Sequence, residues 1–520
     1  MIRVDLLVLK MIGALGIVML FCCVTLTKGR AEGPPGPQQE QRDPKATANC
    51  PDVSLRSIDK IDFSAIAALK KGILGLPCDA VAEDGKSDAR SFQHGFDYYS
   101  WLTFLALNSP ASGNPIGKDE PTVWETYKQL PDVMRADGEA PDAWKEGDNS
   151  PLTPPSECAG KKGMIIHMDM EETYNQPFKS GPLIDQNGNY ALFVIFMNQT
   201  MFEYIKQNSL YNREGQEDFP HNKDIDFPDG DIKQGQLGAI MIKASWKLVS
   251  QSDLAHPKYH VIDALLYRGA KAGCSPVKLG LVGFHVGHKT VSRQQWIWTT
   301  FEHKDNVPTE EEVKNHIPEA RESNEKGNPY SFYKPGCSEF DCSVNQTPEG
   351  SWDPNTLGWN PFPQNPKLRS QIVRTGSATR IDDGDLSTVE DDIKALNIKF
   401  HTSPQIAGTV WSNYDLITTQ WPSGFPCANK KSPGKLPDPT CTPFPTFLAN
   451  STLETFSQPL QRIEIQGNND PGVPLATSSC ISCHNNATTN PAHRNPRTQA
   501  VRSDFTFILE KAHSSQEKIK

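Results

Sequence analysis

The pattern of apolar and polar positions in this chain predicts a body made largely of β-strands. Apolar residues run together or alternate with polar ones over short segments, which is typical of buried and half-buried strands. The predicted strands are 239–249, 259–267, 279–286, 295–300, 370–375 and 408–412. Residues 183–184 and 190–196 flank Asn187-Gly188, a pair that favours a tight hairpin turn. The order of the strands in a sheet does not follow from this pattern.

Two helices are predicted around this body. Residues 91–107 carry apolar side chains at every third or fourth position, and residues 308–326 are polar enough for a surface helix. Residues 328–366, rich in Pro, Gly, Asn and Trp, predict a long irregular segment over the surface. We therefore expect an α+β protein: a β-rich body with peripheral helices, followed by an irregular, partly helical C-terminal segment.

The N-terminus indicates export. Within residues 1–31, two basic residues precede an apolar run from 11 to 27 that contains no charge, which is the pattern of a secretory signal. The run is also nearly long enough to span a bilayer, so an uncleaved anchor is the alternative, and the only membrane attachment we expect. Residues 32–47 are rich in Pro, Gly and Gln and predict a flexible linker. The expected location is the periplasm or another exported compartment.

The charge of the chain argues against nucleic acid as a partner. The 520 residues carry a formal net charge of -10. Without residues 1–31, which hold four basic residues and one acidic residue, 48 basic and 61 acidic residues remain, a balance of -13. An acidic body has no electrostatic attraction for phosphate backbones. A basic-faced protein is the better match if the chain docks to a macromolecule.

The cysteine count agrees with an oxidising compartment. Of 12 cysteines, two lie in the N-terminal apolar run and two in a C-terminal motif, which leaves an even number for disulfides. Cys337 with Cys342, and Cys427 with Cys441, are the pairs predicted from proximity in the sequence. The remaining four would pair among themselves in an order that the sequence does not give: Cys50, Cys78, Cys158 and Cys274.

The C-terminal motif carries the clearest chemistry in the chain. Residues 480–484 are Cys-Ile-Ser-Cys-His, the C-x-x-C-H signature of covalent haem c attachment. On one helical turn, Cys480, Cys483 and His484 share a face, so two thiols bond the vinyl groups while the imidazole ligates the iron. A zinc half-site and a redox disulfide are the alternatives. Zinc requires a second pair of ligands, and a thioredoxin-like pair requires a βαβ pattern; the sequence supplies neither.

With this motif the chain resembles bacterial exported single-haem cytochrome c-type proteins. The stretch Leu279–Pro308 (LGLVGFHVGHKTVSRQQWIWTTFEHKDNVP) is similar to a segment of their large members. The resemblance implies one covalent haem c and export, and it implies no particular substrate. We expect residues 48–425 to form the β-rich body and residues 426–520 the haem c-binding segment.

The sixth iron ligand is the point where the chain departs from small cytochrome domains, which place a methionine after the motif. No methionine follows His484 here, so the ligand is upstream, is His493 or His513, or is absent. His285 is the upstream candidate because it lies on an apolar strand, where Gly283 leaves room for a flat ring. The residues predicted to line a pocket with it are Trp296, Trp298 and His303.

Three classes of function fit a single exported haem. The first is electron transfer, with a redox partner protein docking on the body. The second is a haem-dependent oxidoreductase, peroxidase-like or oxidase-like, with an open iron and a small-molecule substrate. The third is a haem-based sensor or binding module. A filled sixth position favours transfer, and an open one favours catalysis or sensing.

Overall fold

The computed structural model describes one compact part of this chain. The described residues are 75–80, 89–145, 155–167, 169, 173–174, 176, 181–220, 222–267, 273–325, 327–337, 343–353, 358–361, 369–374, 387–422, 443–445, 448–456, 479–495 and 498–516. They belong to the compact unit Thr47–Lys520, whereas Met1–Ala46 forms a second unit outside them. The predicted signal and the whole of the predicted linker lie outside the described residues, which begin at residue 75, and the division after residue 425 stays a prediction. No described helix is both long and apolar enough to cross a bilayer.

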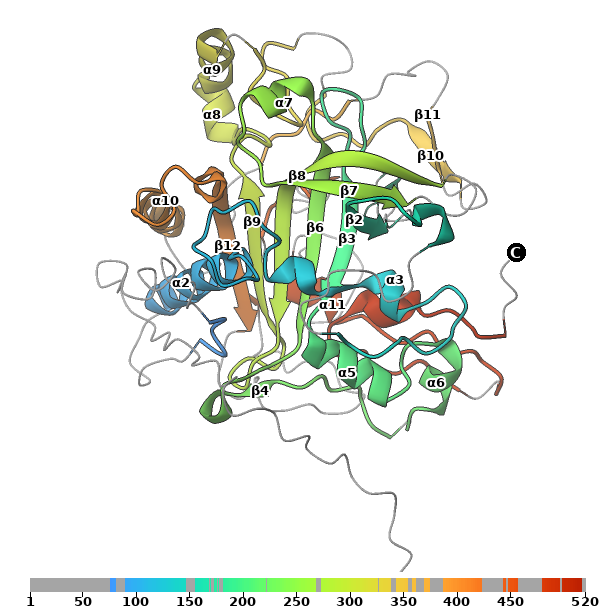
Figure 1. Cartoon of the computed structure of the whole chain (residues 1–520). Helices are drawn as coiled ribbons and strands as arrows, with labels where there is room; N and C mark the ends of the chain where they lie inside the picture. The colour runs from blue at the N-terminus through green and yellow to red at the C-terminus, as the bar shows by residue number, and fades with distance from the viewer. Residues whose placement is uncertain are drawn as a thin grey trace, which may run out of the picture. The chain divides into compact units, whose positions relative to one another are not determined.

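A nine-stranded sheet forms the centre of the unit (Figure 1). Its order is β1-β3-β6-β8-β9-β12-β13, with β7 paired to β8 and β2 paired to β7. The strands are β1 (Lys128–Gln129), β2 (Met164–His167), β3 (Leu192–Met197), β6 (Ile240–Leu248), β7 (Val261–Tyr267), β8 (Cys274–His288), β9 (Ile297–His303), β12 (Tyr414–Pro422) and β13 (Pro443–Phe444). Every pairing is antiparallel except that of β2 with β7. Two small hairpins lie outside it: β4 (Gly230–Asp231) with β5 (Gln236–Leu237), and β10 (Gly350–Asp353) with β11 (Gly358–Pro361).

Helices lie around the sheet. They are α2 (Ala89–Leu107), α3 (Leu130–Val133), α5 (Gln199–Gln207), α6 (Arg213–Asp218), α7 (Gln251–Ala255), α8 (Glu310–Lys314), α9 (Ile317–Glu325), α10 (Ser387–His401) and α11 (Cys480–His484). Helices α2 and α10 pack against each other and against β12. The fold is thus α+β and rich in β-structure, as predicted.

The first core lies between α2, α10 and one face of the sheet. Trp101 of α2 is fully buried there, stacked on Phe400 at 4.6 Å and edge-on to Phe301 at 4.9 Å. Its indole Nε1 donates to Asn397 Oδ1 at 2.9 Å. Buried aromatic side chains of this size contribute more to folding than any other residue type. The apolar spacing of 91–107 therefore produces both the helix and its packing face.

A buried carboxyl group also joins α2 to β12. Asp97 Oδ1 accepts hydrogen bonds from Gln93 Nε2 at 2.9 Å and from the Thr419 backbone N–H at 3.0 Å. Burial raises the pKa of Asp97 to about 7, because the charged form loses its hydration. The protonated form is therefore favoured in the folded state below about pH 7.

This pKa gives a testable pH dependence. Since the folded pKa lies above the unfolded value of about 4, the contribution of Asp97 to stability is complete below pH 4 and is lost as pH rises through 7. Asp97→Asn keeps both acceptor contacts and removes the titration. We expect the free energy of unfolding of the wild type, relative to the variant, to fall by up to about 4 kcal/mol between pH 4 and 8. Urea unfolding of both proteins at four pH values measures this difference. A difference in free energy of unfolding that stays constant over these pH values would contradict the prediction.

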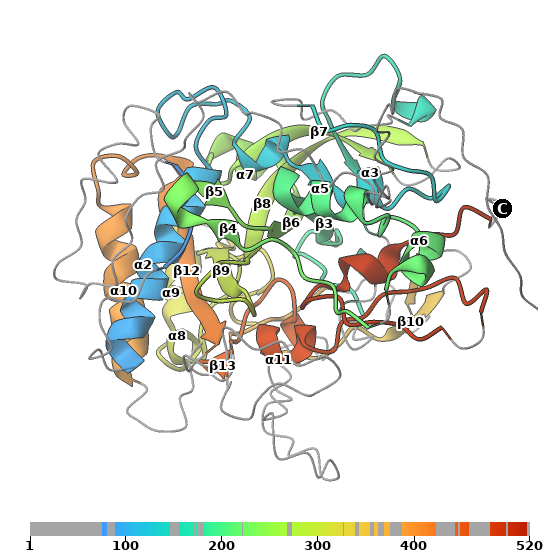
Figure 2. The same cartoon turned by 90° about the horizontal axis from the view of Figure 1, so that it is seen from below.

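The opposite face of the sheet carries a second core. Successive side chains of a strand point to opposite faces of the sheet, and two neighbours in β12 show this. Thr419 contacts α2 through its backbone N–H and its Oγ1. The next residue, Gln420, contacts α11 instead, where its Oε1 accepts from the Ile481 N–H at 2.9 Å. In Figure 2, α11 accordingly lies on the other side of β12 and β9 from α2 and α10. The cluster that includes Met241, Trp296, Trp298, Ile481 and Leu509 fills this side.

Most predicted elements are confirmed, with shifted ends. The helix predicted at 91–107 is α2, and the strands at 239–249, 259–267, 279–286 and 295–300 are β6, β7, β8 and β9. The hairpin at Asn187-Gly188 is confirmed only as a turn closed by the isolated Ile184–Tyr190 bridge, because β3 pairs with β1 and β6 instead.

Two predicted strands are wrong. Residues 369–374 form no strand, and only Arg374 makes an isolated bridge, with Thr309, although Ile372 and Val373 are buried. Residues Val410–Asn413 form a 3-10 helix that precedes β12. Apolar runs this short predict burial better than they predict a ladder. The surface helix predicted at 308–326 is two helices, α8 and α9, separated by Asn315 and His316, and His316 has a positive φ of 54°.

One disulfide is described. Cys158 and Cys274 are bonded with their Cα atoms 5.2 Å apart, across a sequence separation of 116 residues. The bond connects the loop before β2 to the start of β8, and it is one of the pairings that the sequence left open. Of the local pairs, Cys342, Cys427 and Cys441 lie outside the described residues, so both predicted pairs remain untested.

Candidate functional site

The C-x-x-C-H motif forms the single helical turn α11, as its spacing predicts. The Cys483 N–H donates to the Ser479 carbonyl at 3.0 Å, and the Asn485 N–H donates to the Ile481 carbonyl at 2.9 Å. Ile481 is buried against the sheet, and its N–H bond to Gln420 holds the start of the turn on β12. The turn therefore has a fixed position on the second face of the sheet.

The two cysteines of this turn are half-buried thiols. Burial raises the pKa of the Cys480 thiol well above 9, and the nearby Glu454 carboxylate raises it further. Positions i and i+3 of a helical turn lie on one face. The two sulfur atoms and the imidazole one residue later thus form a donor set with the chemistry that covalent haem attachment requires.

The imidazole of His484 has a defined orientation. Its Nδ1 lies 2.9 Å from the Phe505 carbonyl oxygen, and since a carbonyl only accepts, Nδ1 carries the proton. This fixes the tautomer in which Nε2 holds the lone pair that a metal requires. The ring lies between Trp298, at 4.3 Å between centroids, and Phe507, at 5.1 Å. A histidine held by a backbone carbonyl is the arrangement found for metal-ligating imidazoles.

His285 lies on the same face of the sheet as the motif. It pairs with Thr300 across β8 and β9, and the next side chain on that face of β9 is Trp298, which contacts His484. His285 and Trp298 are therefore diagonal neighbours on this face of the sheet. Successive side chains on one face of a strand, such as those of Thr300 and Trp298, are roughly 7 Å apart.

Both ring nitrogens of His285 have hydroxyl partners. Nδ1 lies 3.1 Å from Thr300 Oγ1 and Nε2 lies 3.3 Å from Thr452 Oγ1. Burial lowers the pKa of His285 well below 6.5, and Lys243 lowers it further, so the ring is neutral. The space over Gly283 is filled, because a Cβ there would lie 2.3 Å from Thr452 Oγ1. The prediction of His285 as a sixth ligand stays a prediction.

The two histidines that follow the motif are exposed. His493 has a positive φ of 57°, and His513 forms an isolated parallel bridge with Asn212 through its backbone. Neither prediction as a ligand is tested.

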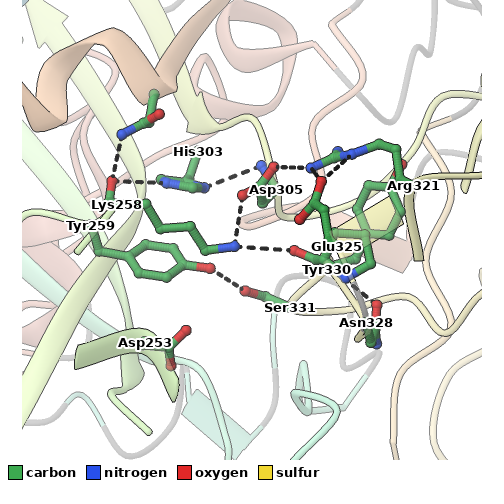
Figure 3. Close-up of polar contacts among 12 residues, drawn as sticks. Asp253, Lys258, Tyr259, His303, Asp305, Arg321, Glu325, Asn328, Tyr330 and Ser331 are labelled. Carbon is green, nitrogen blue, oxygen red and sulfur yellow. Dashed lines mark hydrogen bonds and ion pairs between the residues drawn. The ribbon is translucent and has the colours of Figure 1, made fainter. Parts of the chain in front are cut away.

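The aromatic residues predicted to line a pocket divide between two places. Trp298 contacts His484, and Trp296 lies 6.3 Å from Trp298. His303 belongs to another cluster, at the opposite end of β9 (Figure 3). There its Nε2 donates to the Lys258 carbonyl at 3.1 Å and its Nδ1 accepts from the Asp305 N–H at 3.1 Å. Burial lowers the pKa of His303 to about 3, so it is a neutral structural residue.

The cluster around His303 borders a charged cleft. Asp305 accepts from Lys258 Nζ at 2.7 Å and from Arg321 Nη2 at 2.8 Å, as Figure 3 shows. Burial alone would raise the pKa of Asp305, but the neighbouring His303, Lys258 and Arg321 side chains outweigh it and lower that pKa to about 2. The cleft beside it has a volume of about 760 Å3 and is lined by side chains of both signs, Arg374 and Asp415 among them. It lies at the other end of β9 from the motif.

Three residues beside the motif were missed by sequence reasoning: Phe505, whose carbonyl contacts His484, and the ion pair of Lys289 with Asp504, which precedes Phe505 in the chain. Phe505 supplies a backbone atom, which no side-chain pattern reveals. Lys289 follows an apolar strand, where a lysine ordinarily predicts exposure, yet it is fully buried. Asp504 has a positive φ without the glycine or asparagine that signals one.

Comparisons with known proteins add nothing to the description of this site. No family model matches the chain, and neither a curated protein nor a solved structure is significantly similar to it. Among the described residues, no three His, Cys, Asp or Glu side chains are grouped as a metal site.

Proposed function

We propose that this chain is an exported c-type cytochrome with one covalent haem, acting in electron transfer or redox chemistry. Cys480 and Cys483 hold the haem by thioether bonds, and His484 Nε2 is the proximal ligand of the iron. The haem supplies a one-electron couple whose potential depends on the axial ligands and their surroundings. A redox partner protein exchanges the electron, and the acidic balance of the chain favours a basic-faced partner.

The observation that carries the proposal is the hydrogen bond between His484 Nδ1 and the Phe505 carbonyl. It links a motif of known chemistry to the supporting contact that a metal-ligating histidine requires. A redox disulfide has no need of a histidine whose Nδ1 proton is held in this way, and a zinc half-site requires a second pair of ligands that the sequence does not supply.

A haem-dependent oxidoreductase is the second candidate, with a haem-based sensor as its non-catalytic counterpart. The contacts of His285 favour an open iron, because both ring nitrogens already have hydroxyl partners within hydrogen-bonding distance. His493 and His513 are exposed. An iron with an open sixth position binds peroxide or small gases, whereas one with two protein ligands transfers electrons.

The visible spectrum of the purified protein tests the proposal. The full chain is expressed in a bacterial periplasm together with the haem c maturation machinery, and a pyridine haemochrome is recorded after denaturation. We expect one covalent haem per chain. Absence of covalent haem would overturn the proposal. The ferric spectrum then separates the candidates, since a low-spin iron supports electron transfer and a high-spin iron supports catalysis or sensing.

A further inference from the structure

The segment that accepts the His484 hydrogen bond has an unusual backbone. Asp504 has a φ of 54° and Phe505 a φ of 63°, so two successive residues with side chains occupy the left-handed region. This conformation is unfavourable for L-residues, and for a bulky one such as Phe505 most of all. Backbone of this kind persists only where its surroundings hold it.

A buried ion pair holds this segment. Asp504 Oδ2 accepts a hydrogen bond from the Phe227 N–H at 2.8 Å and forms an ion pair with Lys289 Nζ. The side chains of Lys289 and Asp504 are fully buried. Lys289 follows β8 directly, and its own N–H donates to the Ala239 carbonyl at 2.9 Å. The charge that holds Asp504 is thus fixed to the end of the central strand.

The ammonium group of Lys289 is charged in this setting. Burial alone would lower the pKa of Lys289, but the Asp504 and Asp226 carboxylates outweigh it and raise that pKa. Asp226 lies 2.5 Å from Nζ, and its side chain is 56% exposed. Separating Asp504 from Lys289 would leave a carboxylate buried without its counter-charge, which is strongly unfavourable. The position of Asp504, and of the carbonyl one residue later, is therefore tied to Lys289.

We propose that Lys289 and Asp504 are positioning residues for the proximal histidine: their ion pair holds the Phe505 carbonyl where it accepts the His484 Nδ1 proton. This inference rests on the proposed haem attachment. The hydrogen bond increases the electron density that the imidazole donates to iron and stabilises the ferric state. Loss of the pair releases the carbonyl, weakens the imidazole as a donor and raises the reduction potential.

The charge-neutral double variant Lys289→Met/Asp504→Asn tests the positioning role. The two substitutions remove one positive and one negative charge, so the net charge is unchanged. Water screens the charge of the exposed Asp226, so a direct charge effect on the iron is small. We expect the midpoint potential to shift upward, and the His484 Nδ1 proton to exchange with solvent about tenfold faster by NMR. An unchanged potential together with unchanged proton exchange would overturn the proposal and leave a purely structural ion pair.

The matched control is a second buried pair on the same sheet. Lys247 Nζ lies 3.2 Å from Asp253 Oδ2, and both side chains are at least nine-tenths buried. Lys247→Met/Asp253→Asn removes the same groups away from the motif. We expect this control to leave the potential and the His484 proton unchanged. An equal shift in both double variants would attribute the effect to general destabilisation and contradict the proposal.

A milder variant and a haem-free measurement keep the test decisive. Asp504→Asn retains an acceptor for Phe227 and leaves Lys289 paired with Asp226, so it serves if the double variant does not fold. Hydrogen exchange of residues 501–509 is compared in a Cys480→Ser/Cys483→Ser background, where faster exchange after Asp504→Asn supports the role of the pair. Unchanged exchange there would contradict it. Absence of haem from the wild type would overturn the proposed function, whereas this exchange experiment needs no haem and separately tests whether the pair holds the Phe505 segment.

Discussion

Replacing Cys480 and Cys483 together with serine is expected to abolish covalent haem attachment completely. The two thiols are the only atoms of the motif that form bonds to the vinyl groups, and serine hydroxyls do not add to them under the same conditions. The half-buried turn remains folded, because serine is slightly smaller than cysteine and the contact of Ile481 with Gln420 is untouched. Haem staining after denaturing electrophoresis, with mass spectrometry, measures the attachment.

The single variants are the matched controls for this prediction. Cys480→Ser and Cys483→Ser each leave one thiol on α11, so each is expected to retain one thioether bond and one unreacted vinyl group. The haemochrome band then moves to longer wavelength. Covalent haem that survives in the double variant would place the attachment elsewhere in the chain and remove the basis of the proposed function.

Trp101→Ala is expected to cost about 3–5 kcal/mol in free energy of unfolding. The side chain is fully buried, stacks on Phe400 and meets Phe301 edge-on. Its removal leaves a large cavity and deprives the buried Asn397 of a hydrogen bond from Nε1. Urea unfolding followed by circular dichroism measures the loss.

Trp144 provides the control for the size of this effect. It is half-buried and meets Phe202 at 5.4 Å beside the second core. We expect Trp144→Ala to cost about 1–2 kcal/mol, because much of its surface already contacts water. Equal losses in the two variants would contradict the assignment of Trp101 to the centre of the first core. Covalent haem should persist in folded Trp101→Ala, since α11 lies on the other face of the sheet.

The irregular segments show that an apolar run in the sequence predicts burial but does not predict strand pairing. The run around Ile372 and Val373 predicts a strand, and the structure buries both residues without a ladder. Burial follows from composition, because apolar side chains leave water in any backbone conformation. Pairing depends on a partner strand, which a single run does not specify. The α10 helix was missed for a related reason, since a segment that packs on α2 and β12 obtains its stability from them.

The sequence by itself determined the features that depend on neighbours along the chain. The spacing of Cys480, Cys483 and His484 is a helical turn because positions three and four apart share a face. The apolar periods of α2 and of β6 to β9 likewise fix these elements locally.

Only the tertiary structure decided what surrounds the motif. It placed α11 against Gln420 and Trp298, and it brought the Phe505 carbonyl to His484. It also buried Lys289 beside Asp504, 215 residues away in the chain. Contacts between distant segments depend on the packing of the whole sheet, and a charged side chain remains buried only where its partner is supplied by another part of the fold.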